Sequence, residues 1–200
     1  MTLKFIGRLA GTLALTAGLA GCMDITMEVE VLSETNGKAT TTSVMGADFY
    51  AMAKAGMSQS TEGAESEGFC EEEGATLTEN ADGSATCVVT VEGAFAELSE
   101  GEDGMKFEVV SPGVVKISLS TADMKAELGT EEQDEQTKAM MQSFFEGHAI
   151  TLRIKGKQVI DTNMTLSGDK TSAEQVIPLL DLFNGTLELP PELFATVRTN

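Results

Sequence analysis

Residues 23–45 read MDITMEVEVLSETNGKATTTSVM, and this stretch decides the fold. Apolar side chains alternate with polar ones from position 25 to position 31, which is the period of a half-buried strand. Asn36-Gly37 then offers two residues that tolerate a positive φ, as a tight hairpin turn requires. The β-branched run Thr40-Thr41-Thr42 favours a return strand over 40–45. The segment therefore predicts a β-hairpin.

Three later segments repeat this pattern of two strands around a turn. Residues 75–78 and 86–91 flank Asn80-Ala81-Asp82-Gly83, and residues 105–110 and 114–119 flank Ser111-Pro112-Gly113. Proline followed by glycine suits the central positions of a type II turn. Residues 150–155 are followed by Gly156-Lys157 and then by a returning strand over 160–166. The chain is thus expected to build its sheet from hairpins.

Helical patterns occur between the predicted hairpins. They cover residues 48–57, a segment from Ser120 or Thr121 to Leu128, and a segment from Thr130 to a stop at Gly147. Ser172 and Gln175 have the spacing of a capping box, and Pro178 is expected to begin a helix over 178–183. These elements predict an α+β fold, with an antiparallel sheet built from β-hairpins and three or four helices packed on one face.

The first 22 residues have the layout of an export signal. Lys4 and Arg8 precede a small, apolar run over 9–20 that is too short to span a bilayer stably. The run ends in Leu19-Ala20-Gly21-Cys22, which resembles the lipobox of bacterial lipoproteins. That resemblance implies cleavage before Cys22 and acylation of its sulfur. We therefore expect a signal peptide over 1–21 and a single extracytoplasmic domain over 22–200; the alternative is a buried N-terminal helix.

The charge of the chain limits its partners. Removing residues 1–21 takes away Lys4 and Arg8 and no acid, so the mature chain carries 11 basic and 32 acidic residues. Nucleic acid is disfavoured as a partner because phosphate binding needs a basic surface. Anionic headgroups would also repel such a chain, so membrane attachment must come from acyl chains. The acidity itself is explained by solubility.

Three cysteines form an odd set for an exported protein. If Cys22 is lipidated, Cys70 and Cys87 remain, and an oxidising compartment favours a disulfide between them. Two buried free thiols are the alternative. A metal site is disfavoured because no Cys-x-x-Cys motif occurs and the single histidine, His148, is distant in sequence.

No catalytic or cofactor motif stands out. His148 follows a predicted helix end, where capping explains it, and no Gly-x-Ser-x-Gly elbow accompanies it. Residues 79–84 faintly resemble a calcium loop, but they lack its Asp series and a hairpin turn explains them. Residues 71–73 are three glutamates that suit a solvated loop, and no phosphate-binding loop follows a strand. We expect neither an enzyme, nor a cofactor, nor a metal.

The predicted helix before Gly147 carries an apolar stripe that could bind a ligand. The stripe consists of Met140, Met141, Phe144 and Phe145. Methionine and phenylalanine adapt to irregular apolar ligands, so the helix could close over a groove for an acyl chain. Packing on the sheet is the ordinary explanation of the same pattern.

The order of these elements resembles the LppM-type lipoprotein domains of bacteria. The resemblance covers residues 22–170 and rests on the export signal, the lipobox, the first hairpin with its Asn36-Gly37 and the late hairpin. It implies an α+β domain associated with envelope lipids. Some members carry a transmembrane helix after the domain, and we expect none in this chain.

Three functions remain open on this basis. The first is a lipid-anchored, non-enzymatic envelope lipoprotein that binds a lipid or another apolar ligand. The second is a structural or assembly partner of other envelope proteins, acting through a sheet edge or the acidic face. The third is an envelope hydrolase. In each case we expect the domain on the periplasmic side of a membrane. An aspartate directly after the cysteine resembles an inner-membrane retention signal, but here Asp24 lies one place later, so the outer membrane is slightly favoured.

Overall fold

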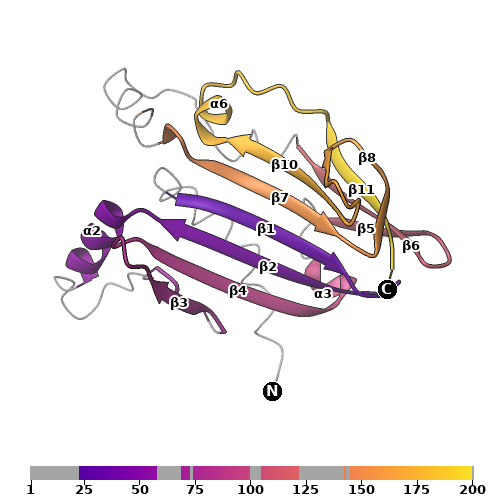
Figure 1. The fold of residues 1–200 in the computed structure, drawn as a ribbon, viewed down its shortest axis with the longest axis horizontal. Coiled ribbons are helices and arrows are strands. Elements are labelled where there is room, and N and C mark those ends of the chain that lie inside the picture. Colours follow the sequence, from indigo (N-terminus) through magenta and orange to yellow (C-terminus); the bar gives the residue numbers. More distant parts are fainter. Residues whose placement is uncertain are drawn as a thin grey trace.

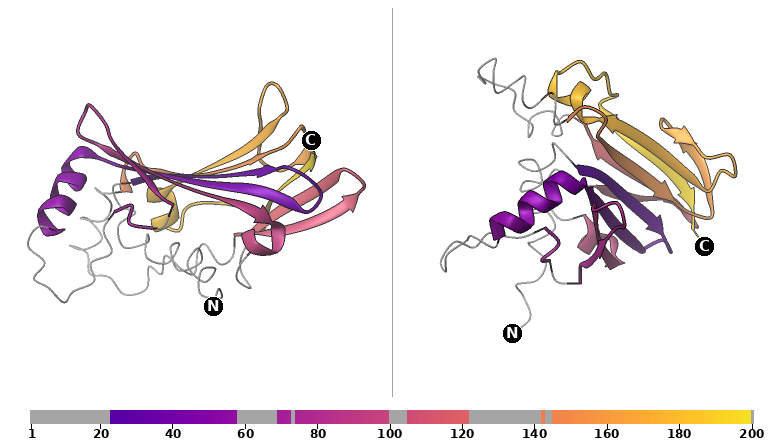
Figure 2. Two further views of the ribbon diagram at one scale, coloured as in Figure 1. Left: turned by 90° about the horizontal axis from the view of Figure 1, so that it is seen from below. Right: turned by 60° about the vertical axis from the view of Figure 1, so that its left-hand side comes forward.

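Two β-sheets form most of the protein. The computed structural model describes residues 23–57, 69–72, 74–99, 105–121, 142 and 145–199. One sheet is long, and the other packs against part of one of its faces (Figures 1 and 2). Three short helices are present among the described residues.

The elements have the following bounds. The strands of the long sheet are β1 Met23–Val31, β2 Asn36–Met45, β3 Thr76–Glu79, β4 Ala85–Ala94, β7 Ala149–Lys155, β9 Thr165–Leu166 and β10 Ser172–Pro178. Those of the smaller sheet are β5 Lys106–Ser111, β6 Val114–Ser120, β8 Gln158–Thr162 and β11 Glu192–Arg198. The helices are α2 Ala47–Met57, α3 Phe95–Leu98 and α6 Leu179–Phe183.

A parallel strand pair lies at the centre of the long sheet. The strand order of the long sheet is β3-β4-β2-β1-β7-β10-β9, and that of the smaller sheet is β5-β6-β11-β8. Strand β1 pairs with β7 in parallel, with Ile25 opposite Ile150 and Val29 opposite Ile154. The prediction of an antiparallel sheet is therefore wrong at this pair. Parallel strands need a long crossover, here from β1 to β7, and such pairing cannot be recognised from local turns.

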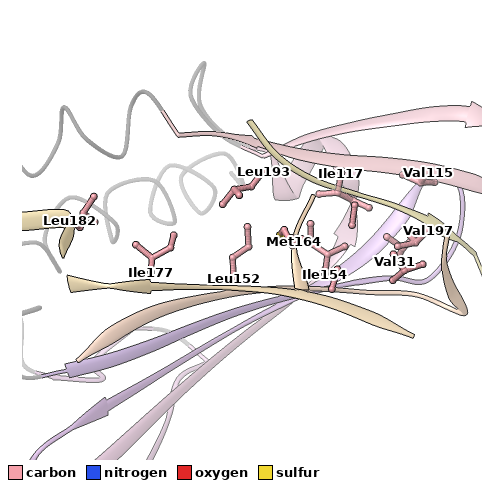
Figure 3. Packing of buried hydrophobic residues seen from close by; sticks show 13 residues of the cluster. Val31, Val115, Ile117, Leu152, Ile154, Met164, Ile177, Leu182, Leu193 and Val197 are labelled. Atoms are coloured by element: carbon pink, nitrogen blue, oxygen red, sulfur yellow. The ribbon is translucent and has the colours of Figure 1, made fainter. Parts of the chain in front are cut away.

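The main core lies between the two sheets (Figure 3). The long sheet contributes aliphatic side chains from β1, β7 and β10, and the smaller sheet contributes them from β6, β8 and β11. The largest side chains that are almost fully buried there are Val31, Val115, Ile117, Leu152, Ile154, Ile177, Leu193 and Val197. Close packing of these groups holds the sheets together.

A second apolar cluster lies beneath α2, near the start of β1. Met23 and Met45 are paired across β1 and β2, and both pack with Tyr50 of the helix. Helix α2 begins at Ala47, two residues after Met45, as the sequence predicts for residues 48–57. This cluster fixes α2 to the end of the sheet where β1 begins.

Two of the predicted hairpins are confirmed with their turns. Strands β5 and β6 pair around Pro112-Gly113, and Gly113 has a φ of 72°, as a type II turn requires. Strands β3 and β4 pair around residues 80–84, where Gly83 has a φ of 87°. In both turns glycine supplies a backbone conformation that is costly for other residues.

The first hairpin is confirmed, but its turn is not at Asn36-Gly37. Gly37 is already paired with Val31, and the turn uses residues 32–35. The Ser33 hydroxyl accepts hydrogen bonds from the backbone amides of Thr35 and Asn36, which closes this turn. A Cβ at Gly37 would lie 3.1 Å from both the Glu30 carbonyl oxygen and the Phe95 ring, so close approach of α3 explains the glycine.

The predicted return strand over 160–166 is also wrong as a partner of β7. After Gly156 the chain crosses into the smaller sheet, where β8 pairs with β11, and β10 pairs with β7 instead. A Cβ at Gly156 would lie 2.9 Å from the Arg198 carbonyl oxygen, so the glycine permits this crossing. Residues 172–178 form β10 rather than a capped helix start.

The structure is mostly β, and helices packed on one face are not shown. Helix α6 follows Pro178 as predicted. The predicted helix that ends at Leu128 lies almost wholly outside the described residues, and so does most of the one that ends at Gly147. Within the described ranges, no helix has the length and apolar character needed to cross a membrane.

Candidate functional site

The predicted apolar ligand site is only partly within the described residues. Met140, Met141 and Phe144 lie outside them. Phe145 is only 2% exposed and packs on α6, with its ring centroid 5.1 Å from that of Phe183. Phe145 is therefore a packing residue, and the proposed groove stays a prediction.

The predicted disulfide between Cys70 and Cys87 is confirmed. The two sulfur atoms are 2.04 Å apart and the Cα atoms 5.4 Å apart. The bridge joins the segment before β3 to strand β4, where Cys87 lies opposite Leu77 on one side and Ser43 on the other. This pairing leaves Cys22, the cysteine of the predicted lipobox, as the odd one of the three in the sequence.

Cys22 lies outside the described residues, and Met23, the residue that follows it, is the first one described. Met23 is already in the β1–β2 ladder opposite Met45, and it is only 2% exposed. A group attached to Cys22 would thus be one residue from the sheet. No linker separates the predicted anchor from the domain.

A shallow depression with two basic side chains lies at the opposite end of β1. Its volume is about 370 Å³, and it is lined by Pro112, Gly113, Lys157, Gln158, Arg198 and Thr199. The amide of Gly113 donates a hydrogen bond to the Glu34 carboxylate in the β1–β2 turn, which locates the depression at that end. Neither Lys157 nor Arg198 forms an ion pair with any residue that the structure describes.

A second depression, of about 380 Å³, lies over β1, β7, β9 and β10 and holds a charge network. The Arg153 Nε atom donates to Glu174 at 2.9 Å, and the Lys155 Nζ atom donates to Glu28 at 3.1 Å. The hydrogen bond to Glu174 raises the pKa of Arg153. Two cations and two carboxylates balance here, so the network is self-neutralising. It depends on the β1–β7 pairing, which explains why the sequence did not reveal it.

His148 has one carboxylate nearby in the described structure. Its Nδ1 atom is 3.4 Å from the Asp24 carboxylate, but it is buried and not aligned for a hydrogen bond. Asp24 accepts instead from the backbone amide of Ala149 at 3.0 Å. A general base needs a hydrogen-bonded group that orients it, and the Nδ1 atom of His148 has no such partner among the described residues.

The calcium-like stretch over 79–84 is a hairpin turn, as expected. The Asp82 carboxylate accepts two hydrogen bonds from Ser84, from its amide at 3.0 Å and its hydroxyl at 2.7 Å. The Asn80 amide nitrogen donates to the hydroxyls of Ser84 and Thr86. These side chains stabilise the turn. The part of the chain that the structure describes contains no group of three or more His, Cys, Asp or Glu side chains placed to hold a metal ion.

Comparison with known proteins gives one low-similarity neighbour to report. No family model matches the chain, and no curated protein matches it. Among solved structures, the chain is similar to the NMR structure of the folded domain of Mycobacterium tuberculosis LppM, with a TM-score of 0.44 and 9% sequence identity. The match covers 90% of this chain and 91% of the LppM domain. A similarity at this level indicates nothing about function.

Proposed function

We propose that this chain is a lipid-anchored lipoprotein of the bacterial envelope whose domain binds a partner and catalyses no reaction. The observation that carries the anchor is the cysteine pairing. Because Cys70 and Cys87 form a disulfide, Cys22 is left as a single thiol at the end of an export signal. Acylation of that thiol accounts for the odd number of cysteines in a chain whose other two are oxidised.

The disulfide also supports the proposed compartment. Disulfides form and persist outside the reducing cytoplasm. The acidic composition gives no electrostatic attraction to anionic lipids, so stable attachment needs two or more acyl chains. A diacylated Cys22 meets that requirement, and it places the domain on the extracytoplasmic side, with the outer membrane favoured.

Binding of a lipid or another apolar ligand is the first form of the proposed function. It rests on the stripe that includes Met140, Met141 and Phe144, together with the adaptable side chains of methionine and phenylalanine. Phe145, the fourth residue of the stripe, packs on α6 in the described structure. Native mass spectrometry of the domain after gentle extraction tests this form: a co-purifying lipid supports it, and a domain that takes up no lipid or detergent contradicts it.

A protein partner is the second form, and the end of the domain that holds the basic depression favours it. Strand β5 is an edge of the smaller sheet, and Val109 and Val110 on it are about half exposed. The depression with Lys157 and Arg198 lies beside the β5–β6 turn. A sheet-edge strand next to two cations that form no ion pair with the described residues suits an extended acidic segment of another envelope protein.

In-cell photo-crosslinking tests this second form. A photoreactive residue at Val110 should give a discrete crosslinked product that the Lys157→Glu substitution weakens. The same probe at Met52, on the opposite end of the sheet, is the control. Equal crosslinking from both positions, or a Val110 product that Lys157→Glu leaves unchanged, would contradict binding at the depression.

Cell fractionation tests the anchor that both forms share. The unaltered chain should sediment with membranes, whereas Cys22→Ser should remain in the soluble periplasmic fraction or be retained unprocessed. Cys70→Ala/Cys87→Ala is the control, because it removes the other two cysteines and should leave the protein with the membranes. A Cys22→Ser protein that is cut normally and still sediments with membranes would contradict acyl anchoring.

A further inference from the structure

We propose that helix α2 lies against the bilayer surface, with the exposed side chain of Met52 inserted among the headgroups. This inference rests on the proposed acylation of Cys22 and adds the orientation of the domain to it. The occupant of this surface is a phospholipid bilayer, because strand β1 begins at Met23, the residue that follows the proposed anchor.

The distance between anchor and sheet leaves the domain little freedom. Met23 is buried and paired with Met45, so the residue that follows the acylated cysteine is already part of the rigid sheet. Consecutive Cα atoms are about 3.8 Å apart, so the start of β1 is held within a few ångströms of the anchored residue. The end of the domain that contains Met23 must therefore face the membrane.

Helix α2 belongs to that end. It begins two residues after Met45, the partner of Met23, and Figures 1 and 2 show it beside the start of β1. Neighbouring antiparallel Cα atoms are about 5 Å apart, and a helix rises about 1.5 Å per residue. A path from Cys22 to Met23, across the ladder to Met45 and along α2 puts Met52 within roughly 25 Å of Cys22. The helix is held in this orientation because Tyr50 is packed in the cluster with Met23 and Met45.

The outward side of α2 exposes one large apolar side chain, that of Met52. Phe49, Tyr50 and Ala53 pack toward the sheet, and the exposed residues of the helix are Asp48, Ala51, Met52, Lys54 and Ala55. Met52 is 58% exposed, more than any other large apolar residue in the described part of the chain. A methionine flanked by alanines can enter the headgroup layer at little cost, and helices that lie in this layer are buried by about 5–10 Å.

Acidic groups on the same end determine which lipids suit the contact. Asp24, Asp48 and Asp82 are on β1, α2 and the β3–β4 turn, and Glu79 is paired with Lys54. Anionic headgroups would repel these carboxylates, whereas zwitterionic headgroups would not. We therefore expect the contact to be closest on vesicles of phosphatidylethanolamine and phosphatidylcholine, and weaker when phosphatidylglycerol is added.

Fluorescence quenching by labelled lipids tests the orientation. Met52→Cys and Val110→Cys provide two single labelling sites, because the disulfide and the acylated Cys22 leave no other free thiol. Val110 is 48% exposed, close to the value for Met52, and lies next to the turn that contacts Glu34 at the far end of β1. Each full-length acylated protein is extracted, labelled and reconstituted in zwitterionic vesicles that contain lipids with a quencher near the headgroup.

The label at position 52 should lose most of its fluorescence, whereas the label at position 110 should keep nearly all of it. Equal signals from the two positions in protein that floats with the vesicles would overturn the orientation and leave the anchor intact. Extracted protein without an acyl group on Cys22 would overturn the anchor, and the orientation with it. Because Met52 is exposed, its substitution should not disturb folding, which the far-ultraviolet circular dichroism of the labelled protein checks.

Discussion

Removal of the Cys70–Cys87 disulfide should destabilise the domain by an amount that its loop length sets. The bridge spans 17 positions. In the chain-entropy description, a loop of this size stabilises the native state by about 3 kcal/mol, because it restricts the unfolded chain. The relevant perturbation is Cys70→Ala/Cys87→Ala in a Cys22→Ser background, which provides a soluble parent for comparison.

A local conformational cost offsets part of this stabilisation. Cys70 has a φ of 71°, in the left-handed region that residues other than glycine rarely adopt. That conformation costs about 1 kcal/mol, and it can relax once the bridge is absent. The net loss should therefore be about 2 kcal/mol, which corresponds to a fall in Tm of about 4–8 °C for a domain of this size.

Thermal unfolding followed by circular dichroism measures this loss. Reductant should lower the Tm of the parent to nearly that of the double variant and leave the variant unchanged. The reduced parent keeps both sulfur atoms, so this control separates the cross-link from the packing of Cys87. Equal Tm values for parent and variant, with or without reductant, would refute the entropic reasoning and the claim that the bridge stabilises the fold.

Two further predictions test local contacts. Tyr50, the single tyrosine of the chain, donates a 2.7 Å hydrogen bond to Glu79, and this bond raises the pKa of the phenol. The hydrogen bond therefore stabilises the fold at neutral pH, and this stabilisation is lost as the pH rises through the raised pKa. Spectrophotometric titration should show Glu79→Gln shifting the phenolate transition to lower pH; an unchanged midpoint would contradict this hydrogen bond. Gly156→Ala should destabilise the domain by about 1–3 kcal/mol, because its Cβ would meet backbone of the neighbouring strand. In denaturant unfolding, Gly168→Ala is the matched control with open space around it, and a loss as large for Gly168 as for Gly156 would count against the close crossing.

The features predicted correctly from the sequence are those set by short-range chemistry. Pro112-Gly113 fixes a turn within four residues, and Pro178 marks a helix start because it cannot occupy a helix interior. The disulfide was predicted from the number of cysteines together with the expected export signal. The turn predicted at Asn36-Gly37 was wrong for an equally local reason. The Ser33 hydroxyl closes the turn before these residues, and Gly37 is needed because Phe95 packs closely against it.

The features that the sequence did not reveal depend on contacts between distant segments. The parallel pairing of β1 with β7 joins residues more than a hundred positions apart. Strand β8 belongs to the smaller sheet, where Val159 is buried in the core between the two sheets and Ile160 is about half exposed. The charge network of Arg153 and Glu28 exists only once that strand order is set. Periodicity defines which face of a strand is buried, but it does not define the neighbouring strand.

The mass of the N-terminal peptide of membrane-extracted protein tests the central claim most directly. The account predicts that the mature chain begins at Cys22 and that this peptide carries a diacylglyceryl group on sulfur. The rest of the chain should contain no free thiol, since Cys70 and Cys87 are joined. A mature chain that begins at another residue, or a Cys22 peptide without added lipid mass, would contradict the account.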